Sequence, residues 1–225
     1  MATSTTRSLL AALALVAGAT AAAAVSSGPA AAGDAPTTHT GAADVDPDRP
    51  ASPFWVERVI AEADIVRELQ FPVLLGAEFA DTFGACRGEH CERSHRGNDL
   101  FAPKLRPLVA ARSGTVTWLR TDTAGTAGNG VAITDAQGWR YLYLHVNDDS
   151  PGSDDGANPA TWRFGPGIEL GAEVEAGQLI GYLGDSGNAE TTPPHLHFEL
   201  RTPYGFDIDP FPSLVAAVAA ATRPS

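Results

Sequence analysis

The chain has 225 residues, of which 44% are hydrophobic and 19% are charged, and its formal net charge at pH 7 is −12. This length fits one ordinary globular domain. Nucleic-acid binding requires clustered Lys and Arg side chains, and Lys104 is the only lysine of this acidic chain, so we expect no nucleic-acid partner.

Residues 1–32 have the pattern of a secretory signal peptide. One early arginine precedes a run rich in Ala, Leu and Val from Leu9 to about Val25, and small residues at the end of the run predict cleavage between about Ala22 and Ala32. The run approaches the ~20 residues that span a bilayer, so an uncleaved membrane anchor is the alternative. Alanine is only weakly apolar, which favours cleavage, secretion and no stable membrane insertion afterwards.

The next two segments differ in their hydrophobic pattern. Residues 33–51 are rich in Ala, Thr, Pro, Gly and Asp without an apolar period, which predicts a disordered linker. Residues 52–70 begin with Ser52 as a candidate N-cap and Pro53 at the first helical position. Hydrophobic residues then recur at three- and four-residue steps, at Trp55, Val56, Val59, Ile60, Ala63, Val66 and Leu69. This spacing predicts one amphipathic helix that packs on the following domain.

From Phe71 onward, short apolar runs are separated by Gly, Asp, Asn and Pro. Runs such as "GTVTWLR", "GVAIT", "WRYLYLHV" and "HLHFELR" predict a mainly β domain of antiparallel strands over 71–212, followed by a short C-terminal tail, 213–225. The tract "NDDSPGSDDGANPATWRFGPG" is too long and polar for a tight hairpin, which indicates a surface loop. Its four Asp residues do not fit a calcium-loop spacing, and we interpret them as solvated.

The chain has two cysteines, Cys86 and Cys91. An even number of cysteines in an exported chain predicts a disulfide, which here would stiffen one loop. A structural zinc cluster made of Cys86, His90, Cys91 and His95 is the alternative, although an oxidising compartment argues against free thiolates.

The stretch "HLHFEL" alternates polar and apolar side chains. On a strand, residues two apart share a face. The apolar face, which we expect in the core, has Leu196, Phe198 and Leu200, and the opposite face has His195, His197 and Glu199. We therefore expect the histidines to point into a groove or into solvent.

The same alternation in "WRYLYLHV" predicts that another histidine leaves the core. It assigns Leu142, Leu144 and Val146 to the core, and it assigns to the other face Trp139, Tyr141, Tyr143 and His145. A single exposed histidine would have little meaning, but two such strands in one domain point to a site.

A third cluster lies in "SHRGNDLFAP", where His95 and Asp99 are four residues apart around Gly97. Imidazole and carboxylate are both zinc ligands, and the glycine allows the backbone to turn so that both can reach one ion. The spacing is common by chance, so a loop aspartate with a nearby histidine is the alternative.

In this order, the three clusters resemble the lysostaphin-type, or LytM-type, zinc endopeptidases of bacterial cell walls. Their pattern is H-x-x-x-D, then Y-x-H, then H-x-H, which here reads "HRGND", "YLH" and "HLH". The resemblance covers about residues 71–212 and implies the duplicated hybrid motif fold, an antiparallel β-sheet or sandwich with a groove for one zinc ion. It implies that the three zinc ligands are His95, Asp99 and His197. It also implies that the two catalytic histidines are His145 and His195, without assigning their individual roles.

The resemblance further implies hydrolysis of peptide bonds in peptidoglycan cross-links or stems by zinc-activated water, with two histidines sharing proton transfer and oxyanion stabilisation. It thus implies a secreted, cell-wall-associated enzyme whose partner is a peptidoglycan peptide. Glu199 is a candidate to orient a histidine, with a solvated glutamate as the alternative. The candidate walls of the groove are Trp139, Tyr141 and Tyr143.

Three other functions remain open. The first is a catalytically silent, wall-binding member of the same fold that activates another hydrolase, although the chain keeps all five expected site residues. The second is a biotinyl- or lipoyl-type carrier, suggested by "GAEVEAGQLIGYLG", but Lys104 lies outside that block. The third is a zinc carboxypeptidase that trims D-alanyl ends, whose ligand types are similar but whose motif spacing differs.

Overall fold

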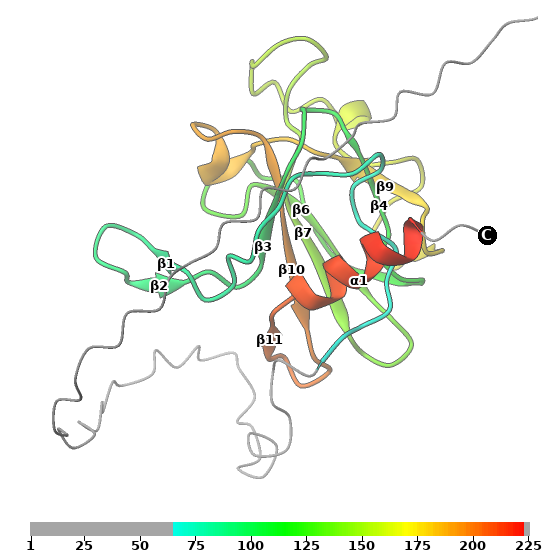
Figure 1. Ribbon diagram of the computed structural model, residues 1–225. Coiled ribbons are helices and arrows are strands. Elements are labelled where there is room, and N and C mark those ends of the chain that lie inside the picture. Colours follow the sequence, from blue (N-terminus) through cyan, green and yellow to red (C-terminus); the bar gives the residue numbers. More distant parts are fainter. Residues whose placement is uncertain (1–64, 223–225) are drawn as a thin grey trace, which may run out of the picture. The chain divides into compact units, whose positions relative to one another are not determined.

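The computed structural model describes residues 65–222 of the chain (Figure 1). The predicted signal peptide, the predicted linker and most of the predicted helix 52–70 lie outside these residues. Residues 65–70, the described end of that helix, have no regular secondary structure. Within the described part of the chain, the single α-helix is too short to cross a bilayer.

Most of the domain is built from one antiparallel sheet of seven strands (Figure 1). In spatial order they are β11 (Asp207–Ile208), β10 (His195–Arg201), β7 (Arg140–Val146), β6 (Asn129–Thr134), β5 (Gly114–Arg120) and β8 (Glu173–Val174), while β3 (Asn98–Phe101) also pairs with β10. Two smaller sheets pair β4 (Pro107–Val109) with β9 (Leu179–Tyr182), and β1 (Cys86–Arg87) with β2 (Arg93–Ser94). Two short 3-10 helices are η2 (Ala160–Trp162) and η3 (Gly187–Ala189). The prediction of a mainly β, antiparallel fold is confirmed.

Strand β10 is the central element of the site because it has neighbours along both edges. β7 pairs along one edge, and the other edge is shared between β3 and β11. The apolar face of β10 is fully buried in the core, as its alternation predicts, with Leu196, Phe198 and Leu200. The opposite face therefore carries the two histidines of "HLH".

The face assignment predicted for β7 is wrong for four residues. Tyr141 and Tyr143 are completely buried in the core, while Leu142 and Leu144 lie on the face of His197 and Glu199. The two tyrosines can be buried because their hydroxyl groups are hydrogen-bonded. The Tyr141 hydroxyl donates to Asp135, and the Tyr143 hydroxyl accepts from the backbone N–H of Ala111. The tyrosines are therefore core residues and do not line a groove.

Trp139 does not line the groove either. Its ring packs against the core and is covered by the Arg67 guanidinium, whose central carbon lies 4.6 Å from the ring centroid. Arg67 is held in place by an ion pair with Asp135 at 2.9 Å. The segment that precedes the β domain is thus attached to it by Arg67, which packs on Trp139 and pairs with Asp135.

The predicted C-terminal tail is mostly a helix, α1 (Phe211–Ala221). Leu214 and Ala217 pack into the core, and the Ser213 hydroxyl accepts a hydrogen bond from the backbone N–H of Arg67 at 2.9 Å. The run "FPSLVAAVAAA" has a proline in the first turn and five alanines, which are good helix formers, in its second half.

The predicted disulfide between Cys86 and Cys91 is confirmed, and it closes the loop of the β1–β2 hairpin. Both sulfurs are consumed, so the alternative zinc cluster at these cysteines is wrong. The predicted solvation of the acidic loop is wrong in part, because Asp148 and Asp149 are 2% and 1% exposed.

Candidate metal centre

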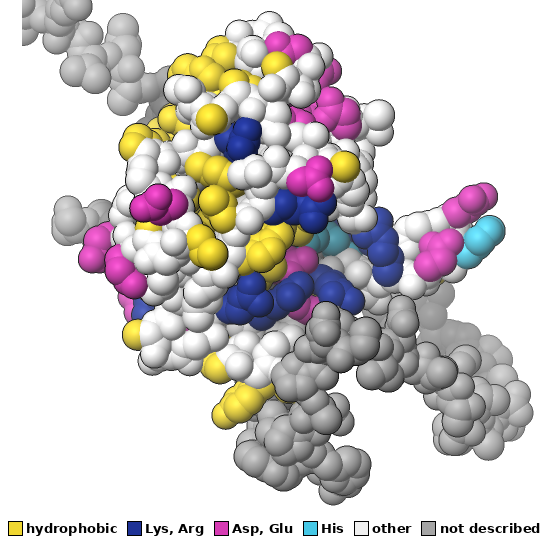
Figure 2. All heavy atoms as spheres, turned by 180° about the vertical axis from the view of Figure 1, so that it is seen from behind, with side chains coloured by type: hydrophobic (Ala, Val, Ile, Leu, Met, Phe, Trp, Pro, Cys, Tyr) yellow, Lys and Arg dark blue, Asp and Glu magenta, His cyan; other side chains and the backbone are white. Residues whose placement is uncertain are grey.

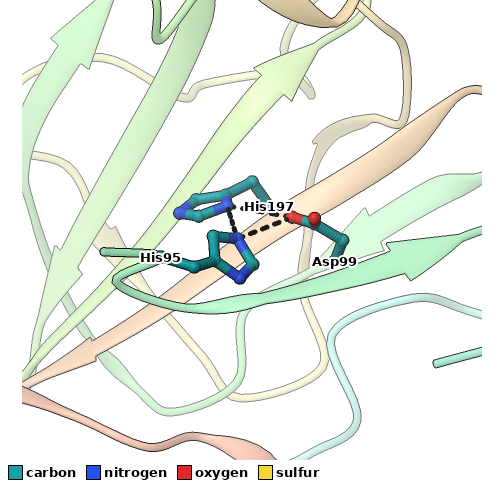
Figure 3. A group of neighbouring side chains, drawn as sticks. All are labelled: His95, Asp99 and His197. Carbon is teal, nitrogen blue, oxygen red and sulfur yellow. Dashed lines mark hydrogen bonds and ion pairs between the residues drawn. The ribbon is translucent and has the colours of Figure 1, made fainter. Parts of the chain in front are cut away.

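Two histidines and one aspartate converge on the polar face of β10 (Figure 3). The Nε2 atom of His95 lies 2.9 Å from Nδ1 of His197, and each of these nitrogens lies 3.0 Å from Oδ1 of Asp99. Three donor atoms on a tetrahedral zinc ion would lie about 3.3 Å apart, given Zn–N and Zn–O bonds near 2.0–2.2 Å. The donor types and spacing therefore fit a zinc ion.

The strand register explains how residues almost a hundred positions apart meet. β3 and β10 are antiparallel, and Asp99 is directly opposite His197 in their ladder. Cross-strand partners place their side chains on the same face, so this pair needs no special loop. His95 reaches the same point from the turn just before β3.

Gly97 brings this turn close to β10. A Cβ atom added at Gly97 would lie 2.2 Å from the backbone oxygen of Phe198, whereas no positive φ is recorded there. The glycine therefore permits a close backbone approach, and the turning role expected from the sequence is not its main one.

We expect Gly97→Ala to separate β3 from β10, since the clash is with backbone atoms that cannot rotate away. The expected cost is about 1–3 kcal/mol of unfolding free energy, together with weaker zinc binding. Denaturant unfolding and zinc titration measure the two effects. Gly76→Ala is the control: Gly76 has open space but a φ of +85°, so alanine there should cost stability through backbone strain alone and leave zinc affinity unchanged. Unaltered zinc affinity in Gly97→Ala would contradict this role.

The second ring nitrogen of each candidate ligand is tied to an oxygen that can only accept a hydrogen bond. His95 donates from Nδ1 to the carbonyl of Thr82 at 2.8 Å, and His197 donates from Nε2 to the Glu199 carboxylate at 3.1 Å. The proton position is thereby set, and the lone pairs of His95 Nε2 and His197 Nδ1 face Asp99. Such partners orient metal-bound histidines in general. Glu199 is thus a partner of His197 rather than a solvated residue, and it is held in turn by Arg201 at 2.6 Å.

The charges of this cluster stabilise one another. Burial would raise the pKa of Asp99, but His197 and His95 hold it well below its ordinary value through the hydrogen bonds and positive charge of their protonated rings. Burial would lower the pKa of His197, but hydrogen bonds to Asp99 and Glu199 raise it. Burial likewise opposes ionisation of Glu199, whose pKa is nevertheless lowered by His197 and Arg201. The site therefore concentrates negative charge around the imidazole nitrogens, as a cation site requires.

His195 and His145 lie beside the cluster, and each ring is held by a backbone carbonyl. Their ring centroids are 5.0 Å apart, and His195 Nε2 lies 3.8 Å from Oδ1 of Asp99. His195 donates from Nδ1 to the Pro193 carbonyl at 2.8 Å, and His145 donates from Nδ1 to the Ser186 carbonyl at 2.9 Å. In the neutral form, both rings therefore keep an unprotonated Nε2 that can accept a proton.

A β-bulge turns the His145 side chain towards the cavity. The β6–β7 register passes from Asn129 opposite Val146 to Gly130 opposite Leu144, so His145 is the extra residue, and its φ is +60°. The bulge breaks the alternation, which puts Leu144 and His145 on the site side and returns Val146 to the core. The prediction that His145 leaves the core is correct, although the alternation used to reach it is not.

Both histidines are kept neutral by their surroundings. Burial, followed by the neighbouring His195 and His197, lowers the pKa of His145 to about 3. Burial also lowers the pKa of His195, against the opposing effects of the Pro193 carbonyl and Asp99. Both rings therefore have an unprotonated Nε2 that can accept a proton, and the lowered pKa makes His145 a weaker base than an ordinary histidine.

Comparison with known proteins agrees with the motif pattern. The chain is 30% identical over 155 residues to the L-Ala–D-Glu endopeptidase of Bacillus subtilis (strain 168), a match covering 64% of this chain and 42% of that protein. It is 32% identical over 107 residues to the peptidoglycan DD-endopeptidase ShyC of Vibrio cholerae, covering 48% and 20%. Over part of its length, the chain is therefore similar to peptidoglycan endopeptidases.

Other comparisons define the extent of this relationship. A match to the DD-carboxypeptidase/endopeptidase Mpg of Neisseria meningitidis serogroup B has 31% identity and covers 50% of this chain and 21% of that protein. The chain thus spans less than half the length of each of these relatives.

Among solved structures, the lysostaphin catalytic domain of Staphylococcus simulans has 24% identity and a TM-score of 0.48, covering 62% of this chain and 92% of that chain. A zinc-containing peptidase of Vibrio cholerae has 24% identity and a TM-score of 0.47, covering 63% and 39%. No protein-family model matches the chain.

All five residues singled out by the lysostaphin-type pattern line one cavity of about 490 Å³. Arginines border the same cavity, at Arg87, Arg93 and Arg96. Figure 2 shows one face of the molecule, on which dark blue Lys and Arg side chains lie beside a small cyan histidine surface, together with magenta acidic side chains. The rim of the cavity therefore carries positively charged side chains, of which Arg87 pairs with Asp99 and Arg96 with Asp207.

Several residues of the site escaped prediction. Arg87 forms a 2.6 Å ion pair with Oδ2 of Asp99 and so turns Oδ1 towards the histidines. The disulfide loop places this arginine, but its sequence gave no indication of the contact. The carbonyls of Thr82, Pro193 and Ser186 orient three histidines through backbone atoms, which carry no residue-type signal.

Proposed function

We propose that the chain is a secreted, zinc-dependent endopeptidase that hydrolyses peptide bonds in peptidoglycan cross-links or stems. The observation that carries the proposal is the convergence of His95 Nε2, Asp99 Oδ1 and His197 Nδ1 in a cavity that also contains two neutral histidines. A silent wall-binding protein would have no need to keep this donor set with every ring oriented.

The roles of the side chains follow from their hydrogen bonds. A zinc ion held by His95, Asp99 and His197 would supply a Lewis acid that polarises the scissile carbonyl and acidifies a water molecule. The Nε2 atom of His145 or His195 would accept a proton from the attacking water, and the protonated ring would return that proton to the leaving amine. The Ser186 and Pro193 carbonyls hold Nδ1 of each ring throughout, because they stabilise the proton there.

The cationic rim favours an acidic peptide as substrate. Arg93 and Arg96 are exposed beside the cavity, where their guanidinium groups can pair with substrate carboxylates, although Arg96 also lies 3.7 Å from Asp207. The Bacillus subtilis relative is named for cleavage beside D-Glu, a residue with a carboxylate. We accordingly propose that wall peptides with free carboxylates enter this cavity.

The test is to incubate the chain from about Gly33 onward with purified peptidoglycan and to measure newly released amino groups. We expect release that a zinc chelator abolishes and that added zinc restores. Walls with glycyl bridges and walls with direct D-amino-acid cross-links should be compared, and identification of the new N-termini names the bond.

Two outcomes would overturn the proposal. Release of free D-alanine alone would indicate a carboxypeptidase that trims D-alanyl ends. Failure to release amino groups from either wall, despite one bound zinc per chain, would indicate a catalytically silent wall-binding protein.

A further inference from the structure

A second group of acidic side chains lies away from the histidine cluster. Asp148 follows β7, Asp185 precedes η3, and Glu190 follows η3. Each contributes a carboxylate oxygen, and these oxygens all lie within 4.8 Å of one another. Two of these residues flank η3 and one follows β7, and carboxylates at this spacing repel one another when they are ionised; Lys104 pairs with Asp185 among them.

Two of these carboxylates are buried with an unused oxygen. Asp148 is 2% exposed and Asp185 is 3% exposed, and in each the Oδ1 atom is buried without a hydrogen-bond partner. Burying a carboxylate oxygen without a hydrogen-bond partner is costly, so each of these two atoms requires an explanation. Burial, then Glu190, Asp149 and Asp185, raises the pKa of Asp148 to about 7.

A neighbouring group of aspartates differs from this one because a lysine neutralises it. Lys104 pairs with Asp149 at 2.5 Å, Asp154 at 2.6 Å and Asp185 at 2.8 Å. Burial alone would lower the pKa of Lys104, but hydrogen bonds to these carboxylates raise it above its ordinary value. The ammonium group reaches Oδ2 of Asp185, whereas Oδ1 of the same carboxylate has no hydrogen-bond partner.

We propose that Asp148, Asp185 and Glu190 bind a second divalent cation of the hard, oxygen-preferring class, with Ca²⁺ as the expected ion. The donors are all carboxylate oxygens, which suit Ca²⁺, whereas the imidazole-containing cluster suits zinc. Glu190 is exposed, so the group is open to solvent on one side, from which an ion can enter and retain water ligands.

The cation connects to the groove through the chain between its ligands. Asp185 immediately precedes Ser186, whose carbonyl holds the His145 ring, and Glu190 immediately follows Asn188 and Ala189, which line the cavity. A bound cation would therefore hold both ends of the 185–190 segment against the loop that starts after β7. Its effect is to stabilise one wall of the groove.

The test uses zinc-loaded protein, so that the histidine cluster is already filled, and a Ca²⁺ titration at pH 8 followed by calorimetry and by the unfolding temperature. We expect saturable binding of one Ca²⁺ and a rise in Tm. Glu190→Gln, at an exposed position, should abolish both effects. Asp148→Asn should also abolish them while raising the Tm of the Ca²⁺-free protein, since it removes a buried carboxylate whose raised pKa makes its ionised form unfavourable at this pH.

Glu169→Gln is the matched control, because Glu169 is exposed and lies outside the cluster; it should bind Ca²⁺ as the unaltered chain does. The proposal is overturned if the unaltered chain shows neither Ca²⁺ binding nor a Tm shift with Ca²⁺, Mg²⁺ or Mn²⁺. It is equally overturned if the Ca²⁺ response persists in both Asp148→Asn and Glu190→Gln.

Discussion

His197→Ala is expected to remove both the bound zinc and the peptidase activity. The substitution leaves only His95 and Asp99 of the candidate ligands, and it removes the imidazole that Glu199 orients. The loss of zinc affinity should exceed the roughly 10–100-fold that follows removal of an outer partner of a metal ligand. Zinc per chain, measured by elemental analysis after gel filtration, gives the result directly.

His90→Ala is the matched control for this substitution, because His90 is an exposed histidine in the disulfide-bonded loop. It should retain one zinc and full activity. A His197→Ala protein that still holds one zinc with unchanged affinity would show that the metal is bound elsewhere.

His145→Ala and His195→Ala are expected to keep the zinc and lose turnover by about 10²–10⁴-fold, the usual contribution of general acid–base catalysis. Neither ring shares a hydrogen bond with the three donor atoms, and each is held by a backbone carbonyl instead. The measurement is kcat on a soluble wall peptide, alongside zinc content.

The comparison between His195 and His197 is the most informative because both lie on β10, one pleat apart. The two alanine variants should differ in zinc content while both lose activity. Loss of zinc in His195→Ala to the extent seen in His197→Ala would contradict the division of roles, as would activity in His145→Ala equal to that of the unaltered chain.

The sequence was sufficient to predict the part of the site that depends on strict alternation. In β10, residues 195–200 keep a period of two, so the core face and the histidine face could be separated correctly. The pairing of His95 with Asp99 could be proposed from ligand chemistry. Their meeting with His197 depends on the β3–β10 register, which the family resemblance implied and residue spacing alone could not.

The errors have identifiable physical causes. In β7, every residue from 141 to 144 is apolar or aromatic, so either set of alternate residues could have faced the core. The register with β10 places Tyr141 and Tyr143 in the core. The bulge at His145 inserts one extra residue into β7 and so reverses which face the following residues occupy. Nothing in the residue pattern predicts this insertion. The acidic loop was interpreted by its own spacing, whereas its buried Asp148 meets Asp185, a residue 37 positions later by their numbering.

Anomalous X-ray diffraction at the zinc edge, from crystals grown with zinc, tests the central claim most directly. We expect one strong peak bonded to His95 Nε2, Asp99 Oδ1 and His197 Nδ1 at about 2.0–2.2 Å. The peak should also leave His145 and His195 unbonded, with their Nδ1 atoms on the carbonyls of Ser186 and Pro193. A crystal with no zinc at these three atoms, or with zinc bonded to His145 or His195 in their place, would contradict it.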